Sequence, residues 1–356
     1  MRVFRKLLIL IVALAVLAAA GAGLWLWQGL QTLKQPVALD EPVLFSVEQG
    51  TSFGRLAQKL SDDGLVSDPL WLKLYGRLNP EQTRIKAGDY ELQPGMTPLA
   101  MLDTMVEGKV KLWSVQFIEG WTFSDMRTAL ANSRQLRKET TDWTDEQVME
   151  AVGAEGQHPE GWFFPDTYMF SGSETDLDIL KRAYKRMTAV LEEEWENREE
   201  GLPYSSPYEA LIMASIVERE TGVAYERQQV AGVVVRRLQK GMRLQTDPTV
   251  IYGMGDSYDG RIRTRDLRAY TPYNTYRIDG LPPTPIALPG RDSVHAALHP
   301  DDGDALYFVA RGDGSHTFSR TLAEHQKAVR EFQLNRREDY RSFPAPDAGA
   351  DDNEEN

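Results

Sequence analysis

Residues 208–220 read YEALIMASIVERE, and this stretch decides how the C-terminal part of the chain folds. Apolar residues fall on almost every side of a helix with 3.6 residues per turn, which predicts a helix buried in a core. Glu218 is the exception inside that helix. It follows Ala214 by four residues and Ser215 by three, so the three side chains share one face.

Glu218 is a candidate general acid. The helix is expected to stop at Gly222, which puts Glu218 in the last turn. A helix C-terminus and partial burial both disfavour an ionised carboxylate, as a general acid requires. The same pattern also fits a buried structural glutamate paired with an arginine, either Arg236 or Arg243.

A second carboxylate follows the next predicted helix, residues 225–240, which ends at Gly241. Asp247 stands directly before Pro248, an arrangement typical of an N-cap with proline at the first helical position. Asp247 is therefore either a helix cap or a carboxylate that works beside Glu218.

Residues 270–290 form a predicted rigid loop, because its many prolines fix the backbone. Tyr273, Asn274 and Tyr276 alternate flat apolar rings with an amide. Such a combination suits a sugar ring, which needs both stacking and hydrogen bonds. A packed surface loop fits the same residues. Beyond it, residues 306–310 and 316–319 are expected to form a hairpin.

Towards the N-terminus one pattern occurs three times, in residues 45–60, 90–105 and 115–130. Each copy has a strand-like run, a glycine, and two residues later a hydroxyl residue that opens an amphipathic run. The pattern predicts a strand, a turn and an N-capped helix. The glycines are Gly50, Gly95 and Gly120, and the predicted caps are Ser52, Thr97 and Thr122.

Residues 7–27 carry no charge, and as a helix they are about 31 Å long, which matches a bilayer core. Three basic residues precede this run, so the positive-inside rule places residues 1–6 in the cytoplasm and the rest outside it. The alternative is a cleaved signal peptide with its small-residue site at residues 18–20.

Composition excludes several classes of function. The formal net charge of −13 over 356 residues disfavours binding to nucleic acid. The absence of cysteine rules out disulfides, thiolate metal sites and a cysteine nucleophile. His295 and His299 have i, i+4 spacing but no glutamate between them, so no metal site is expected. There is no G-x-S-x-G motif of a serine hydrolase and no glycine-rich phosphate loop.

Five motifs in order resemble the endolytic murein transglycosylases of the YceG/MltG-like family. They are residues 160–168 (EGWFFPDTY), 214–221 (ASIVERET), 241–253 (GMRLQTDPTVIYG), 273–287 (YNTY through GLPPTPIA) and 313–319 (DGSHTFS). The resemblance implies that Glu218 is the catalytic residue and that no cofactor is needed. The expected substrate-binding residues around it are Gln245, Thr246, Asp247, Tyr273, Asn274 and Tyr276.

The resemblance also implies a reaction and a setting. The enzyme would cut the β-1,4 bond from N-acetylmuramic acid to N-acetylglucosamine inside glycan strands and leave 1,6-anhydro ends. It would limit strand length during cell-wall synthesis, with peptidoglycan as substrate and peptidoglycan synthases as partners. The expected location is the inner membrane, with a single span and a periplasmic catalytic domain.

The expected fold class is α+β. The domain plan is a cytoplasmic tail (1–6), a transmembrane helix (7–27), a linker (28–42), a LysM-like βα domain (43–110), an α+β catalytic domain (111–340) and a disordered acidic tail (341–356). The first unit of the LysM-like domain suggests glycan binding, and spacing the enzyme from the membrane is the alternative.

Two other functions fit the sequence. One is a peptidoglycan hydrolase that uses Asp247 or Asp166 as a second carboxylate. The other is a scaffold that binds glycan without catalysis and tethers the wall to the membrane.

Overall fold

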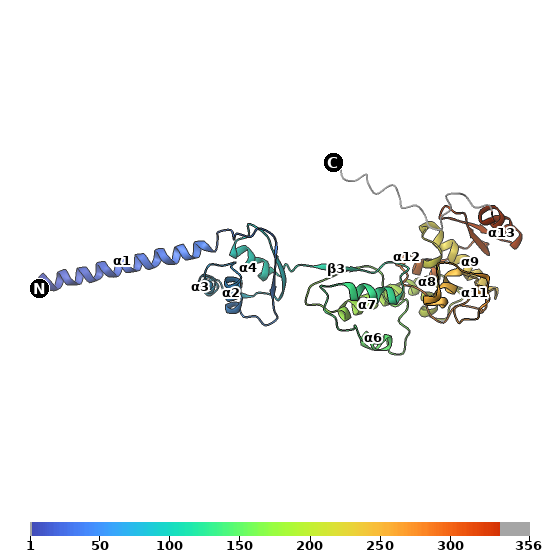
Figure 1. Cartoon of the computed structure of the whole chain (residues 1–356), viewed down its shortest axis with the longest axis horizontal. Helices are drawn as coiled ribbons and strands as arrows, with labels where there is room; N and C mark the ends of the chain where they lie inside the picture. The colour runs from blue at the N-terminus through green and yellow to red at the C-terminus, as the bar shows by residue number, and fades with distance from the viewer. Residues whose placement is uncertain (1, 335–356) are drawn as a thin grey trace. The chain divides into compact units, whose positions relative to one another are not determined.

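The computed structural model describes residues 2–334 (Figure 1), so the predicted acidic tail at 341–356 lies outside the described residues. The chain divides into two compact units. Unit 1 comprises Met1–Trp113 and Met169–Glu174, and unit 2 comprises Ser114–Tyr168 and Thr175–Asn356. The chain crosses between them inside strand β3 (Trp113–Gln116), inside strand β4 (Thr167–Phe170) and again after Glu174. Strands β3 and β4 pair in a two-stranded sheet.

Unit 1 begins with a long apolar helix, α1 (Arg2–Thr32). Its segment Phe4–Thr32 has the length and composition needed to cross a membrane. The helix therefore extends five residues past the predicted run of 7–27. Its C-terminal end packs within unit 1, because the Trp25 ring centroid lies 4.7 Å from that of Trp71 and Leu33 is fully buried.

The rest of unit 1 surrounds one small antiparallel sheet. Strand β1 (Val43–Val47) pairs with β2 (Gly88–Leu92), so that Phe45 lies opposite Tyr90 in the core. The helices of this unit are α2 (Phe53–Asp62), α3 (Pro69–Leu78), η1 (Pro80–Thr83) and α4 (Pro98–Glu107). A LysM-like identity for this domain stays a prediction.

The threefold pattern of strand, turn and capped helix is confirmed. The three glycines have φ values of 79°, 84° and 79°, a backbone conformation that glycine adopts without strain. Ser52, Thr97 and Thr122 each accept a hydrogen bond from the backbone N–H three residues on. In the third copy Asp125 completes a capping box at the start of helix α5 (Phe123–Asn132).

Unit 2 is built around helix α8 (Pro207–Glu220), in which residues 210–217 are all buried. The predicted buried helix is thus confirmed. It packs against α7 (Asp176–Glu196), α9 (Arg227–Gln239), α10 (Asp247–Met254) and α12 (Arg291–Leu298). The remaining elements are α6 (Asp145–Ala151), η2 (Ala224–Glu226), η3 (Gly255–Ser257), α11 (Thr264–Arg268), β5 (Tyr307–Ala310), β6 (His316–Ser319), α13 (Leu322–Val329) and the π-helical turn η4 (Arg330–Leu334).

The fold combines helices with small two-stranded sheets, which agrees with the predicted α+β class. The predicted hairpin is confirmed, since β5 pairs antiparallel with β6. One local prediction was wrong by a residue. Thr246 occupies the N-cap of α10 and Asp247 is its first helical residue, so Asp247 is not the cap.

We expect Gly161→Ala to destabilise unit 2 by about 2–4 kcal/mol, from a left-handed backbone and a steric clash. Gly161 has φ +84°, and an added Cβ would lie 2.6 Å from Cβ and Cγ of Pro285. The matched control is Gly153→Ala, because Gly153 has φ +88° and nothing within 4 Å of its added Cβ. Chemical denaturation measures the free energy of unfolding of both variants. An equal loss of stability in the two would exclude the steric clash with Pro285 as a cause.

Candidate active site

Two glutamates at the end of α8 face different surroundings. Glu218 and Glu220 are two residues apart, and at 100° per residue their side chains point in nearly opposite directions. The sequence predicts Glu218 as the general acid, so the contacts of both carboxyls bear on the assignment.

Glu218 points towards the N-terminus of α12. Its Oε2 accepts a hydrogen bond from the backbone N–H of Gly290 at 2.9 Å. Glu119 lies on the same side, because a Cβ built on Gly290 would be 2.0 Å from Glu119 Oε1. Partial burial, and then the negative charge of Glu218, raise the pKa of Glu119, while Arg227 opposes the shift. Glu218 thus belongs to a pair of carboxyls beside a helix N-terminus.

Glu220 lines the largest cavity described in unit 2, with a volume of about 620 Å³. Residues from α8, α9, α10, the hairpin β5–β6 and α13 surround this cavity. Its walls include both polar and apolar side chains. They are Arg219, Glu220, Arg237, Leu244, Gln245, Asp247, Tyr276, Tyr307, Phe308, Val309, Ala310, His316, Leu322, His325, Val329 and Gln333.

The environment of Glu220 favours its protonated form. Burial raises the pKa of Glu220 to about 7, and the negative charge of Asp247 adds to the shift. The Thr246 side chain and, more weakly, the Arg237 guanidinium oppose the shift. An acid with this pKa holds its proton in a useful fraction of molecules at neutral pH, and it can give the proton up and take it back.

Three of the predicted substrate-binding residues meet Glu220 in this cavity. The Tyr276 hydroxyl donates a hydrogen bond to Asp247 Oδ1 at 2.7 Å, and both side chains line the walls. Gln245 has a backbone φ of +54°. Among the non-glycine residues whose backbone is described, it alone has a positive φ. Such strain is typical of functional sites, and the Gln245 N–H bonds Thr275 O at 3.2 Å. Thr246 is buried beside it.

Tyr273 and Asn274 make their contacts elsewhere in the loop. The Tyr273 ring packs edge-on against Tyr252, and its hydroxyl bonds Thr284 at 3.0 Å. Asn274 is 1% exposed, and its amide closes the loop by donating to three backbone carbonyls. Neither is among the cavity-lining residues, and their direct contact with substrate stays a prediction.

A second buried glutamate also has a raised pKa. Burial raises the pKa of Glu160 to about 7. Both of its oxygens are occupied, Oε1 by the N–H of Phe123 at 2.9 Å and Oε2 by the Tyr252 hydroxyl at 3.0 Å. Glu160 borders a separate cavity of about 350 Å³ that contains none of the predicted substrate-binding residues. It therefore ties α5 to α10 and is a weaker candidate for the acid.

Glu160 is expected to make the protein less stable as pH rises. Its folded-state pKa of about 7 lies above the ordinary 4.5, so the folded protein holds the proton more tightly than the unfolded chain. Between pH 5 and pH 8 this should lower the free energy of unfolding by about 2–3 kcal/mol. Glu160→Gln should remove that part of the pH dependence, as denaturant titrations at both pH values would measure. An equal pH dependence in the variant would contradict the assignment.

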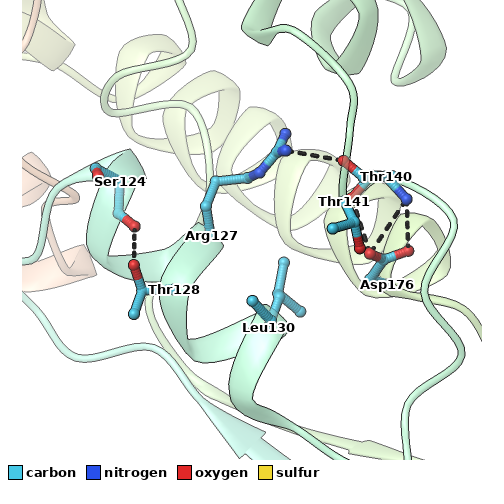
Figure 2. A pocket seen from close by; sticks show the side chains of 8 residues that line it. Ser124, Arg127, Thr128, Leu130, Thr140, Thr141 and Asp176 are labelled. Carbon is cyan, nitrogen blue, oxygen red and sulfur yellow. Dashed lines mark hydrogen bonds between the residues drawn. The ribbon is translucent and has the colours of Figure 1, made fainter.

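A smaller cavity of about 250 Å³ lies beside α5 (Figure 2). Its polar groups bond mainly to one another. Arg127 donates to Thr140 O at 2.8 Å, and the buried Asp176 carboxylate accepts from the backbone N–H groups of Glu139, Thr140 and Leu177. This arrangement fixes the start of α7 and offers no free carboxyl for acid catalysis.

The structure also bears on the alternatives raised by the sequence. Arg236 pairs with Asp301 and Arg243 with Asp279, so neither is the partner of Glu218. Asp166 forms an ion pair with Arg186 and lies outside the cavity of Glu220.

The spacing of His295 and His299 does bring them together with a carboxylate. Ligand atoms of Glu194, His295 and His299 lie within 4.8 Å of one another. Glu194 already bonds Arg291 and His295, and His299 bonds the Asn197 carbonyl. These contacts account for the cluster as an ion-pair network, and the expectation of no metal stays a prediction.

Sequence reasoning did not single out Glu220, Glu119 or His316 as candidate site residues. Glu220 was visible in the same ASIVERET motif as Glu218. The helical periodicity of the sequence does not show which side of the end of α8 faces a cavity. Glu119 lies 99 residues before Glu218, and nothing local in the sequence indicates their proximity.

The sequence and the fold both match a known protein family. The model of the YceG-like family matches residues 45–331, so the chain belongs to the YceG-like family. A curated relative from Bacillus subtilis, named endolytic murein transglycosylase, is 31% identical over 86% of this chain and 90% of its own length. A relative of the same name from Streptococcus pneumoniae is 25% identical over 81% of this chain, which spans 58% of that longer protein. The crystal structure of a YceG-like protein from Listeria monocytogenes is 30% identical, with a TM-score of 0.51 over 81% of this chain and 99% of that one.

Proposed function

We propose that this protein is an endolytic lytic transglycosylase of peptidoglycan. The observation that carries the proposal is the 620 Å³ cavity, in which Glu220, with its pKa raised to about 7, meets Asp247, Tyr276 and Gln245. Two relatives at 31% and 25% identity bear the name endolytic murein transglycosylase. A carboxyl with two roles is what the reaction of such an enzyme requires.

In the proposed reaction one carboxyl acts twice. Protonated Glu220 gives its proton to the bridging oxygen as the bond to C1 of N-acetylmuramic acid breaks. The resulting carboxylate then takes the proton of the 6-hydroxyl of the same sugar, whose oxygen bonds to C1 and closes the 1,6-anhydro ring. No water enters, and Glu220 ends the cycle protonated as it began.

Glu218 remains the alternative acid, as the family resemblance implies. Glu220 is favoured because it shares a cavity with three of the six predicted substrate-binding residues, whereas one oxygen of Glu218 is occupied by Gly290. Asp247 is proposed as a supporting residue. Its Oδ1 holds the Tyr276 hydroxyl, and its charge helps to keep Glu220 protonated.

The setting proposed for the enzyme follows from α1. The helix would anchor the chain in the inner membrane, with the basic residues before it in the cytoplasm and unit 2 in the periplasm. The same proposal includes three further roles. They are limitation of glycan-strand length, association with peptidoglycan synthases, and glycan binding by the LysM-like domain.

Mass spectrometry of purified glycan strands digested by the protein tests the function. A transglycosylase releases fragments with 1,6-anhydro ends and no added water. Reducing ends with the mass of one added water would instead show a hydrolase that uses Glu220 with Asp247. Strands that stay intact would favour the scaffold.

A further inference from the structure

A buried histidine–glutamate pair has one member, His316, in the wall of the cavity that Glu220 lines. His316 Nδ1 lies 2.8 Å from Glu226 Oε2, and the side chains are 8% and 3% exposed. The backbone N–H of His316 donates to the other oxygen, Oε1, also at 2.8 Å. The Thr221 hydroxyl donates to Oε2 at 3.4 Å. Thr221 follows Glu220 directly, so the pair is tied to the end of α8.

These contacts fix the proton on one side of the imidazole ring. The Glu226 carboxylate receives two other donors, so it faces Nδ1 as an acceptor and Nδ1 must carry hydrogen. In a neutral ring Nε2 is then an acceptor. A carboxylate that orients a histidine in this way is a recurrent arrangement in enzymes.

His316 is the member of the pair that contacts the cavity. His316 lines the cavity that contains Glu220, and its ring packs edge-on against Phe308 on the same wall. Within residues 2–334, Nε2 has no hydrogen-bond partner. The ring therefore presents an unused acceptor to whatever occupies the cavity.

We propose that Nε2 of His316 accepts a hydrogen bond from an O–H or N–H group of the glycan, and that Glu226 is a positioning residue that fixes the required tautomer. The inference rests on the proposed function, because it takes the glycan as the occupant. The role differs from that of Glu220, which exchanges a proton with the reacting oxygens.

The tautomer can be measured without substrate. In ¹⁵N-resolved NMR of wild-type protein, the neutral His316 ring should carry its single proton at Nδ1 and none at Nε2. In Glu226→Gln the side-chain amide can donate to Nδ1, so the proton should move to Nε2. A wild-type ring with its single proton on Nε2 would overturn the inference.

Kinetics on purified glycan strands test the contact itself. His316→Asn keeps a donor near the position of Nδ1 and deletes Nε2, and we expect it to lower kcat/KM about 10–100-fold. Glu226→Gln should do the same through the wrong tautomer. The matched controls are His295→Asn and Glu194→Gln. These residues form a pair of the same 2.8 Å length outside the cavity, and their variants should stay within about twofold of wild type.

The outcomes separate this inference from the proposed function. If His316→Asn and Glu226→Gln both cleave normally while Glu220→Gln does not, only the inference fails. If the wild-type protein leaves glycan strands intact, or releases only reducing ends with one added water, the proposed function fails. If His316→Asn unfolds at a lower temperature than wild type, the test rests on the nearly isosteric Glu226→Gln variant. A lower kcat/KM together with a His316 proton on Nε2 in that variant would support the inference, and normal kinetics would overturn it.

Discussion

Glu220→Gln is expected to lower the rate of glycan-strand cleavage by about 10²–10⁴-fold, the usual effect of removing a general acid. The amide keeps the shape of the carboxyl but has no proton to give, so the fold should be unchanged. Wild-type activity should also fall as pH rises above about 7, because Glu220, whose pKa is raised to about 7, then loses its proton. Cleavage of purified strands, followed by release of 1,6-anhydro ends, measures both effects.

Glu218→Gln is the matched control for this experiment, since it changes the same residue type two positions away. We expect it to retain most of the activity, because Gly290 can still donate to the amide oxygen. The opposite result, with Glu218→Gln inactive and Glu220→Gln active, would assign the acid to Glu218. Near-normal cleavage by both variants would refute a catalytic role for the end of α8.

Asn274→Ala is expected to destabilise unit 2 by about 3–5 kcal/mol, because it strips several buried polar groups of their partners at once. The Asn274 amide donates to the carbonyls of Asp266, Leu267 and Ala269, and its oxygen accepts from the Tyr276 N–H at 3.0 Å. The same loss should loosen Tyr276 and weaken substrate binding. Thermal and denaturant unfolding measure the first effect, and KM measures the second.

The control for this variant is Asn197→Ala. Asn197 donates to one carbonyl, that of Glu193, at the exposed end of α7, so its loss should cost less than about 1 kcal/mol. Equal destabilisation by the two substitutions would show that loop closure does not depend on Asn274.

Much of the secondary structure was predictable because its signals are local. The caps at Ser52, Thr97 and Thr122 depend on a hydroxyl and an N–H three residues apart, and such a pair needs no tertiary contact. The buried helix α8 followed from its apolar composition alone. Asp247 was misplaced by one residue because a helix start depends on backbone geometry that Thr246 and Asp247 both permit.

The site was predictable only in part. The sequence brought attention to Gln245, Asp247 and Tyr276, and the structure places all three at one cavity. Asn274 was expected to face a sugar, yet its amide is buried among backbone carbonyls, because a tight proline-rich loop must satisfy its inward-facing polar groups. An alternation of aromatic and amide residues does not show which side chains turn inward.

By itself, the sequence determined the apolar N-terminal helix, the capped βα units and the buried helix α8. It also indicated the protein family, through five motifs in order. Each of these features depends on residues that are close together in the chain. Only the tertiary structure decided which glutamate of ASIVERET lines the cavity. It also decided that Glu119 lies beside Glu218 and that Glu226 orients His316. The physical reason is that burial and charge at a carboxyl are set by residues far away in the sequence, such as Arg227 for Glu119. Their approach depends on how the helices of unit 2 pack around α8.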